Sequence, residues 1–181
     1  MNALRIIRAS RCPDLPWKNG GGTTREIAVF PPGAGMEDFL WRLSMANVER
    51  PGPFSHFDGV DRVLAVLEGT LHLTGPALDA ALDPGSDPLA FAADQPVDGA
   101  PIGGPVRDLN AMVRRSAFTV RMVRLQAGER AECPDAVNYF LALEAQQLAG
   151  EALAAFDCAQ VSGALTCEGA ALLVSFVAIR A

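Results

Sequence analysis

The sequence has little lysine, histidine and tyrosine, and it lacks any block of basic residues. Its 15 basic residues include a single lysine, Lys18, and they face 21 acidic residues, so the net charge is −6. Proteins that bind nucleic acid by charge carry a basic patch or stripe. We therefore expect no nucleic-acid partner. The preference for arginine suits recognition of planar anions, although codon usage in a GC-rich genome is the simpler explanation.

Cysteine motifs and long apolar runs are also missing. The four cysteines, Cys12, Cys133, Cys158 and Cys167, are widely scattered and form no C-x-x-C pair, so neither a zinc knuckle nor a disulfide framework is indicated. No apolar stretch approaches the length that crosses a bilayer, and the first residues lack the apolar core of a signal peptide. The sequence thus predicts a cytoplasmic protein with reduced thiols and no membrane partner.

The composition is that of a folded protein. Half of the 181 residues are hydrophobic and 20% are charged, which is ordinary for a globular chain with a sizeable core. Short apolar stretches alternate with turn residues, a pattern typical of an all-β sandwich or barrel. The predicted strands are residues 4–7, 23–30, 39–46, 63–67, 70–74, 89–92, 118–125, 138–143 and 171–179.

Three connections need separate arguments. Residues 63–67 and 70–74 are expected to form a hairpin across the turn at 68–69. Residues 75–105 are so rich in proline and glycine that the density excludes long helices and central strands and favours short strands between turns. Residues 144–159 are rich in alanine, which alone would favour a helix. Because Gly150 interrupts that stretch, we predict strands joined by a turn.

The loop at 52–59 leads into a strand that is too apolar for a surface. Asp61 and Arg62 begin this strand, and we expect them to enter an interior. Neighbouring residues on a strand point to opposite faces, so Asp61 cannot easily pair with an inward Arg62. A lone arginine in an apolar interior is costly. Arg62 therefore requires either an internal carboxylate or an anionic ligand.

A glycine-rich loop at residues 20–22 precedes the strand at 23–30. Phosphate-binding loops usually lead into a helix, so a nucleotide site is not favoured. Two interpretations stay open: a glycine hinge at a barrel corner, and a binding loop built from Trp17, Lys18 and Asn19.

The strand at 39–46 has one apolar face and one polar face. Trp41, Leu43 and Met45 share the apolar face, and Arg42 and Ser44 lie on the other. Alternation alone does not decide whether the polar face meets solvent, the usual case, or lines a cavity.

Five ordered blocks resemble the signature of the HutD/Ves family. They are PWKNGGGTTREIA at 16–28, WRLSMA at 41–46, GPFS at 52–55, GVDR at 59–62 and DLNAM at 108–112. The resemblance implies a cupin-like fold of the RmlC-like jelly-roll type, with two small barrels fused as a bicupin. It places one barrel in residues 1–115 and a second half in residues 116–181. It also implies an association with bacterial histidine utilisation, with no catalytic activity established for the family as a class.

The metal motifs of cupins are not retained. A metal-binding cupin carries H-x-H-x3,4-E-x6-G in its first motif and P-x-G-x2-H-x3-N in its second, because imidazoles and a carboxylate hold one divalent ion. With Gly69 as the final glycine of the first motif, the ligand positions hold Ser55, Phe57 and Arg62. Val106 occupies the histidine position of the second. We therefore expect no metal and no other cofactor, and a site that prefers an anion.

The main hypothesis is that Arg62 binds a small carboxylate inside the first barrel. Arginine binds a carboxylate through two parallel hydrogen bonds, and serine and asparagine add neutral donors. The family's pathway suggests histidine, urocanate and formylated or formiminated glutamate as ligands of a regulatory protein. The candidate ligand-binding residues are Trp17, Asn19, Thr23, Arg25, Arg42, Ser44, Ser55, Phe57, Arg62 and Asn110.

Three alternatives stay open. In the first, Arg62 is a structural arginine paired with Glu68, Asp108 or another acid. In the second, the chain is a metal-independent isomerase or hydrolase with His56 or Glu26 as general base, although no nucleophile stands beside a base at a recognisable spacing. In the third, the barrels only scaffold a homodimer through the apolar C-terminal strands, with no pocket in the first barrel. A last histidine, at position 72, is expected to be an exposed strand residue.

Overall fold

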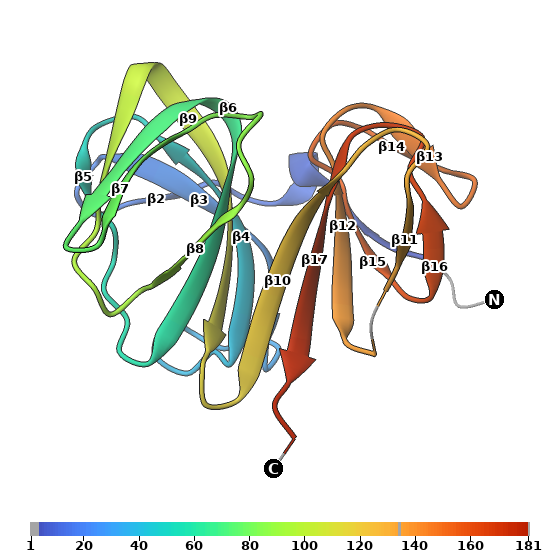
Figure 1. Ribbon diagram of the computed structural model, residues 1–181, viewed down its shortest axis with the longest axis horizontal. Helices are drawn as coiled ribbons and strands as arrows, with labels where there is room; N and C mark the ends of the chain where they lie inside the picture. Colours follow the sequence, from blue (N-terminus) through green and yellow to red (C-terminus); the bar gives the residue numbers. More distant parts are fainter. Residues whose placement is uncertain (1–3, 134, 181) are drawn as a thin grey trace.

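The computed structural model describes residues 4–133 and 135–180, which form two β-sheet units packed side by side (Figure 1). In chain order the elements are β1 (Arg5–Ile7), the 3₁₀ helix η1 (Ala9–Arg11), β2 (Leu15–Pro16), β3 (Gly22–Phe30), β4 (Trp41–Val48), β5 (Gly52–Pro53), β6 (Val60–Gly75), β7 (Leu78–Leu82), β8 (Leu89–Ala92), β9 (Asp98–Arg114), β10 (Phe118–Leu125), β11 (Arg130–Glu132), β12 (Val137–Ala142), β13 (Gln146–Leu148), β14 (Glu151–Leu153), β15 (Cys158–Val161), β16 (Ala164–Thr166) and β17 (Ala171–Ala178). The all-β class is therefore confirmed. No helix in the two described ranges is long and apolar enough to cross a membrane.

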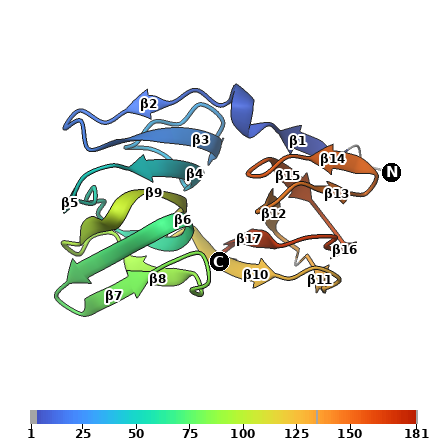
Figure 2. The same cartoon turned by 90° about the horizontal axis from the view of Figure 1, so that it is seen from above.

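Each unit is organised by one main antiparallel sheet. The N-terminal sheet has eight strands in the order β2-β3-β4-β9-β6-β7, with β5 paired to β9 and β8 to β6. The C-terminal sheet has five strands in the order β1-β15-β12-β17-β10, and the ribbons β11-β16 and β13-β14 complete that unit. Figure 2 shows the first strand, in blue, lying among the orange strands of the C-terminal unit.

The N-terminal residues thus connect the two units. β1 pairs with β15, so the first strand of the unit predicted for residues 1–115 lies in the C-terminal sheet. After β1, Arg8 donates to Asp157 at 2.7 Å and to the carbonyl of Ala152 at 2.6 Å. Asp157 is buried and also accepts from the backbone N–H of Ala9 and of Ala154. This carboxylate fixes the point at which the chain leaves one sheet for the other.

The predicted hairpin at 63–67 and 70–74 is wrong, because both halves belong to the single strand β6. β6 pairs with β9 on both sides of a register shift at Glu68. Gly69 has a φ of 81°, which allows the strand to bend there without turning back. The Glu-Gly pair therefore makes a β-bulge rather than a turn. β7 and β8 pair with the two ends of this long bent strand.

The expectation that residues 75–105 contain only short strands between turns is also wrong from Asp98 onward. These residues begin β9, which continues to Arg114 and lies between β4 and β6 from Val106. Pro101 pairs only with Leu71 of β6, where β9 has no second neighbour, so its missing N–H is tolerated. Gly103 and Gly104 have φ of 76° and 150°, which permits the bend into the central half.

The C-terminal predictions were closer to the structure. β10 has the predicted bounds, and residues 144–159 do form two short strands, β13 and β14, rather than a helix. The turn between them uses Ala149 and Gly150, both with positive φ. The two sheets pack through an apolar layer in which the rings of Trp41 and Phe176 stack at 4.5 Å between centroids. The predicted apolar face of β4 therefore lies between the two units.

Candidate functional site

A cavity of about 500 Å³ opens within the N-terminal sheet. We call it the N-terminal pocket. Its polar and aromatic lining comes from the loop around residue 18, from the 50–57 loop and from β3, β4, β6 and β9. These lining residues are Trp17, Lys18, Asn19, Thr24, Arg42, Ser44, Arg50, Phe54, Ser55, Phe57, Arg62 and Asn110. The scaffold alternative assumed that the first barrel has no pocket. The N-terminal unit does hold a cavity, so that assumption is not met.

Strand alternation turns one face of three adjacent strands into the pocket. Arg42 and Arg62 both pair with Met112, from β4 and β6 on either side of β9, and Ser44 lies opposite Asn110. The four polar residues are at most 8% exposed. The polar face of β4 therefore lines a cavity, and the usual case, a polar face in solvent, does not apply here.

Arg62 is a buried cation whose polar contacts are few and long. Its guanidinium donates to Asn110 Oδ1 at 3.3 Å and to the carbonyl of Ser55 at 3.4 Å, while its Nε has no hydrogen-bond partner among the described residues. The rings of Phe54 and Phe91 flank it, with centroids 4.9 and 5.8 Å from Cζ. Burial lowers the pKa of Arg62 to about 10, so it remains charged at neutral pH. Such a group is available to a further acceptor.

Asp108 lies deeper in the same sheet and is fully buried. Its Oδ1 accepts a hydrogen bond from Asn110 Nδ2, whereas Oδ2 has no partner within the described ranges. Burial raises the pKa of Asp108 to about 7, an effect that the charge of Arg62 and the hydrogen bond from Asn110 oppose. Glu68 instead pairs with Arg107 at 3.0 Å. The alternative in which Arg62 is paired directly with Glu68 is therefore wrong, and Asp108 meets Arg62 only through Asn110.

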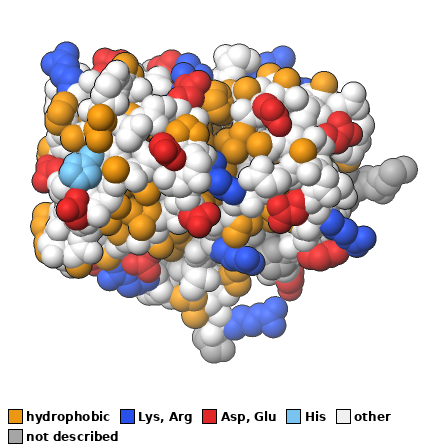
Figure 3. All heavy atoms as spheres, turned by 45° about the horizontal axis from the view of Figure 1, so that its top comes forward, with side chains coloured by type: hydrophobic (Ala, Val, Ile, Leu, Met, Phe, Trp, Pro, Cys, Tyr) orange, Lys and Arg blue, Asp and Glu red, His pale blue; other side chains and the backbone are white. Residues whose placement is uncertain are grey.

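The pocket lining is positively charged although the protein is acidic. Lys18, Arg42, Arg50 and Arg62 line it, and no described Asp or Glu does. Arg42 is held from the side by Glu26 of β3, at 3.0 Å. By contrast, the outer face drawn in Figure 3 mixes blue and red side chains without a block of either sign. A concave site with this charge attracts anions.

The glycine-rich loop both borders the pocket and packs against β4. Trp17 Nε1 donates to Thr24 Oγ1 at 2.7 Å, and Asn19 Oδ1 accepts from the N–H of Gly21 at 2.9 Å. A Cβ on Gly22 would lie 2.1 Å from the carbonyl oxygen of Asn47 on β4. The two interpretations of this loop are therefore compatible, since the glycine permits close packing and the preceding residues reach the cavity.

The structure brings all of the predicted ligand-binding residues to the pocket lining except Thr23 and Arg25. Arg25 lies on the opposite face of β3, where it forms a two-pronged ion pair with Asp14. Of the polar and aromatic lining residues, the predicted ligand-binding set left out Lys18, Thr24, Arg50 and Phe54, although Lys18 belongs to the possible binding loop at residues 17–19. Alternation on β3 would have indicated Thr24, because Glu26 on the same face meets the inward Arg42. Phe54 stands in the GPFS block that carries the family resemblance, next to the predicted Ser55, whereas nothing in the sequence pattern indicates Arg50.

The candidate general bases do not form a catalytic pair in the pocket. His56 Nε2 lies 2.8 Å from Asp58 Oδ1, with the imidazole side chain 58% exposed, and Glu26 is bound to Arg42. His72 is a partly exposed residue of β6 beside Asp79, as expected of a strand residue. Within residues 4–133 and 135–180, no three His, Cys, Asp or Glu side chains lie together as a metal site would require.

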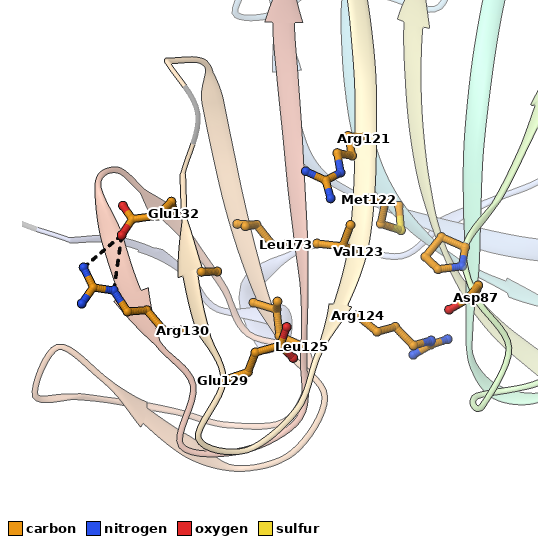
Figure 4. Close-up of a pocket in the computed structure, with 12 residues that line it drawn as sticks. Asp87, Arg121, Met122, Val123, Arg124, Leu125, Glu129, Arg130, Glu132 and Leu173 are labelled. Atoms are coloured by element: carbon orange, nitrogen blue, oxygen red, sulfur yellow. Dashed lines mark hydrogen bonds and ion pairs between the residues drawn. The ribbon is translucent and has the colours of Figure 1, made fainter.

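A second cavity of about 550 Å³ runs along β10 (Figure 4). Its lining mixes Arg121 and Arg124 with Asp87 and Glu129, and the exposed pair Arg130–Glu132 borders it at 2.9 Å. Arg124 donates to the carbonyls of Ser86 and Val66 and so ties β10 to the N-terminal unit. The mixed charge gives this groove no preference for either sign, in contrast to the N-terminal pocket.

The fold and the pocket define an all-β protein of cupin-like architecture with a cationic cavity in its N-terminal unit. A solved structure with this fold, the protein YlbA from Escherichia coli, has a TM-score of 0.68 at 8% identity and covers 96% of this chain and 90% of that one. At that identity the likeness concerns the fold alone. The HutD family model matches residues 9–174, so the chain belongs to the HutD family.

The relatives agree with this assignment. An uncharacterized 21.2 kDa protein in the hutC 3′ region of Pseudomonas putida is 37% identical over 125 residues, which are 67% of this chain and 64% of the relative. The protein Ves from Citrobacter koseri is 42% identical over 101 residues, 55% of this chain and 52% of Ves. The chain thus spans less than two thirds of either relative. The structure of HutD from Pseudomonas fluorescens SBW25 has a TM-score of 0.87 at 31% identity and covers 98% of this chain and 100% of that one.

Proposed function

We propose that the protein acts in histidine utilisation by binding a small carboxylate in the N-terminal pocket, without a metal, and that this binding serves regulation. Membership of the HutD family and the relative named for its place beside hutC support the pathway. The observation that carries the ligand class is Arg62, a buried guanidinium that faces a cavity lined by four cations and by no described acid.

The incomplete hydrogen bonding of Arg62 supports the proposal that its missing partner is a ligand carboxylate. Strong guanidinium–carboxylate bonds are shorter than 3 Å and come in parallel pairs, whereas its present bonds are 3.3 and 3.4 Å long. Ser44 and Ser55, both in the lining, supply neutral donors beside it. Arg42, whose charge is largely matched by Glu26, presents a second guanidinium to the cavity. A carboxylate would therefore complete hydrogen bonds that the protein leaves incomplete.

The size and the walls of the cavity support a small, partly planar ligand. A volume of about 500 Å³ is in the range of small-molecule sites. Trp17, Phe54 and Phe57 present aromatic surface against which an imidazole or amide plane can pack. Histidine, urocanate and formylated or formiminated glutamate combine a carboxylate with such a plane. We also propose that the two sheet units are the halves of a bicupin, of which the N-terminal half carries the site.

Calorimetric titration of histidine, urocanate and N-formylglutamate into the wild type and an Arg62→Ala variant tests the proposal. Loss of the guanidinium is expected to weaken binding by at least about 30-fold, the equivalent of about 2 kcal/mol. Arg62→Lys keeps the charge without the planar fork and should fall between the two. Arg130→Ala removes an exposed arginine of the other unit and is the matched control. Equal affinities of the wild type and Arg62→Ala would exclude this site.

A further inference from the structure

Behind Arg62 the N-terminal sheet encloses a carboxylate that has no complete set of partners. Asp108 is central in β9, with Ala46 of β4 and Val66 of β6 as its cross-strand neighbours. Both neighbours are apolar and nearly inaccessible, so they offer the second carboxylate oxygen no hydrogen bond. An ionised carboxylate in such a place is costly unless a cation compensates it.

Among the charged groups around Asp108, Arg62 is the cation that can compensate an ionised carboxylate. Arg62 comes from β6, and Asn110, on β9 itself, bonds to both Arg62 and Asp108. Arg42 of β4 is close enough for its charge to act on Arg62, but the charge of Arg42 is already matched by Glu26 of β3. The neighbours from β8 and the 50–57 loop, Phe91 and Phe54, are aromatic rings. Asp108 in its ionised form thus depends on one guanidinium.

We propose that binding of a carboxylate at Arg62 is coupled to uptake of one proton by Asp108. This inference rests on the proposed function of the pocket. One guanidinium would otherwise face two carboxylates, one in the cavity and one behind it. When the ligand carboxylate takes the bidentate side of Arg62, Oδ2 of Asp108 binds a proton from solvent, and the buried region keeps its net charge.

The coupling sets the direction of the pH dependence. Burial already raises the pKa of Asp108 to about 7, and Arg62 holds it from rising further. A bound anion offsets the charge of Arg62, so the pKa of Asp108 rises again in the complex. Binding is therefore tighter when Asp108 is protonated beforehand. Affinity should be flat below about pH 6.5 and fall by up to about tenfold per pH unit above about pH 7.5.

Calorimetry of N-formylglutamate binding in two buffers of different ionisation enthalpy measures the proton directly. The carboxylates of this probe stay ionised above about pH 6, so they contribute no proton of their own. We expect the apparent binding enthalpy to be the same in both buffers near pH 6. Near pH 8 the two enthalpies should differ by nearly the difference between the buffers' ionisation enthalpies, because almost one proton is taken up per ligand bound.

Asp108→Asn imitates the protonated acid and keeps the contact with Asn110. It should bind the probe with no proton uptake and with an affinity near pH 8 that matches the wild type near pH 6. Glu68→Gln removes an exposed acid outside the pocket and should keep the wild-type uptake. Should Asp108→Asn fail to fold, the wild-type measurement in two buffers still decides.

The outcomes separate this inference from the proposed function. Binding by the wild type with buffer-independent heats near pH 8 overturns the proton coupling and leaves the carboxylate site standing. If the wild type binds none of histidine, urocanate and N-formylglutamate at any pH tested, the proposed function and the coupling both fall.

Discussion

Arg62 and Asp108 are both buried in the N-terminal sheet, yet no direct ion pair joins them. Asn110 stands between the two, accepting from the guanidinium and donating to the carboxylate. Each charged group keeps one polar atom without a partner among the described residues, Nε of Arg62 and Oδ2 of Asp108. A pair built only for stability would be in contact, because a shared hydrogen bond offsets part of the desolvation of both ions. The separation leaves the outer side of Arg62 free for a ligand.

The first prediction concerns the stability of the ligand-free protein as a function of pH. Burial raises the folded-state pKa of Asp108 to about 7 from a usual value of 3.8. Between these values the folded state binds more protons than the unfolded state, so stability falls as the pH rises through this window. The loss is at most about 4 kcal/mol for a shift of about three units. Urea unfolding of the wild type and of Asp108→Asn checks this: the stability of the variant relative to the wild type should rise from about pH 4 to about pH 7 and change little above that.

A difference between the two proteins that does not change with pH would contradict this account of Asp108. Glu68→Gln serves as the control, because Glu68 is half-exposed beside Arg107 and its replacement should leave the pH-dependent loss attributed to Asp108 in place.

The second prediction concerns Asp157, the carboxylate at the crossing between the two sheets. It accepts from Arg8, from the N–H of Ala9 and from the N–H of Ala154. Asp157→Ala leaves these donors without an acceptor and should lower the free energy of unfolding by about 2–3 kcal/mol. Arg130→Ala, which breaks an exposed ion pair, should cost no more than about 1 kcal/mol.

Asp157 should also respond to acid in the opposite direction to Asp108. Burial raises its pKa, but the hydrogen bonds from Arg8, Ala9 and Ala154 lower it more, so the folded-state pKa lies below the usual value. Its contribution is then complete above about pH 4 and is lost as the pH falls through the folded-state pKa. The difference between the wild type and Asp157→Asn in urea unfolding should shrink in that acid range; a constant difference would show that its charge is not involved.

How far the sequence predicts this site is best judged from Arg62 and Asp108. Because neighbouring residues on a strand point to opposite faces, the sequence predicts that Asp61 cannot pair with an inward Arg62. The structure agrees, since Asp61 pairs with Arg115 at 2.9 Å on the outer side. The expectation that Asp61 also enters the interior was wrong for the same reason. Asp108 stands in a block that carries the family resemblance. Its isolation was not predictable, because it depends on Val66 and Ala46, which adjoin it only once three strands are in register.

The fold was predictable where the signal was local. Short apolar stretches between turn residues located β3, β4, β10, β12 and β17, and Gly150 correctly argued against a helix. The predictions failed at β6 and β9, where glycine and proline mark bends within long strands. Whether a glycine turns a chain back or only bends it depends on the partner strand, which a local pattern does not contain. For that reason the strand pair that carries Arg62 and Asn110 was the part of the fold least accessible from the sequence.

The third prediction concerns the layer between the two sheets. Phe176 is fully buried there and stacks on Trp41. Phe176→Ala should lower the free energy of unfolding by about 3–5 kcal/mol, since the cavity it leaves cannot be filled by a rigid sheet. Ile179→Ala, at an apolar position that is 47% exposed, should change it by about 0.5 kcal/mol or less. Similar losses for the two variants in chemical denaturation would mean that the sheets do not stabilise each other through this layer.

The last prediction tests the packing of the glycine-rich loop against β4. At Gly22 an added Cβ would meet the Asn47 carbonyl oxygen at 2.1 Å, and since that atom belongs to the backbone, β3 must move away from β4. Gly22→Ala should therefore destabilise the protein by about 1–3 kcal/mol and weaken carboxylate binding, because Trp17 and Asn19 move with the strand. At Gly52 no atom lies within 4 Å of the added Cβ, so Gly52→Ala is the matched control for stability, which should stay near the wild type. Because Gly52 also lines the pocket, the carboxylate affinity of Gly22→Ala is compared with that of the wild type. Thermal unfolding and calorimetric titration of the two variants decide whether this glycine is needed for close packing; a Gly22→Ala protein as stable as Gly52→Ala would show that it is not.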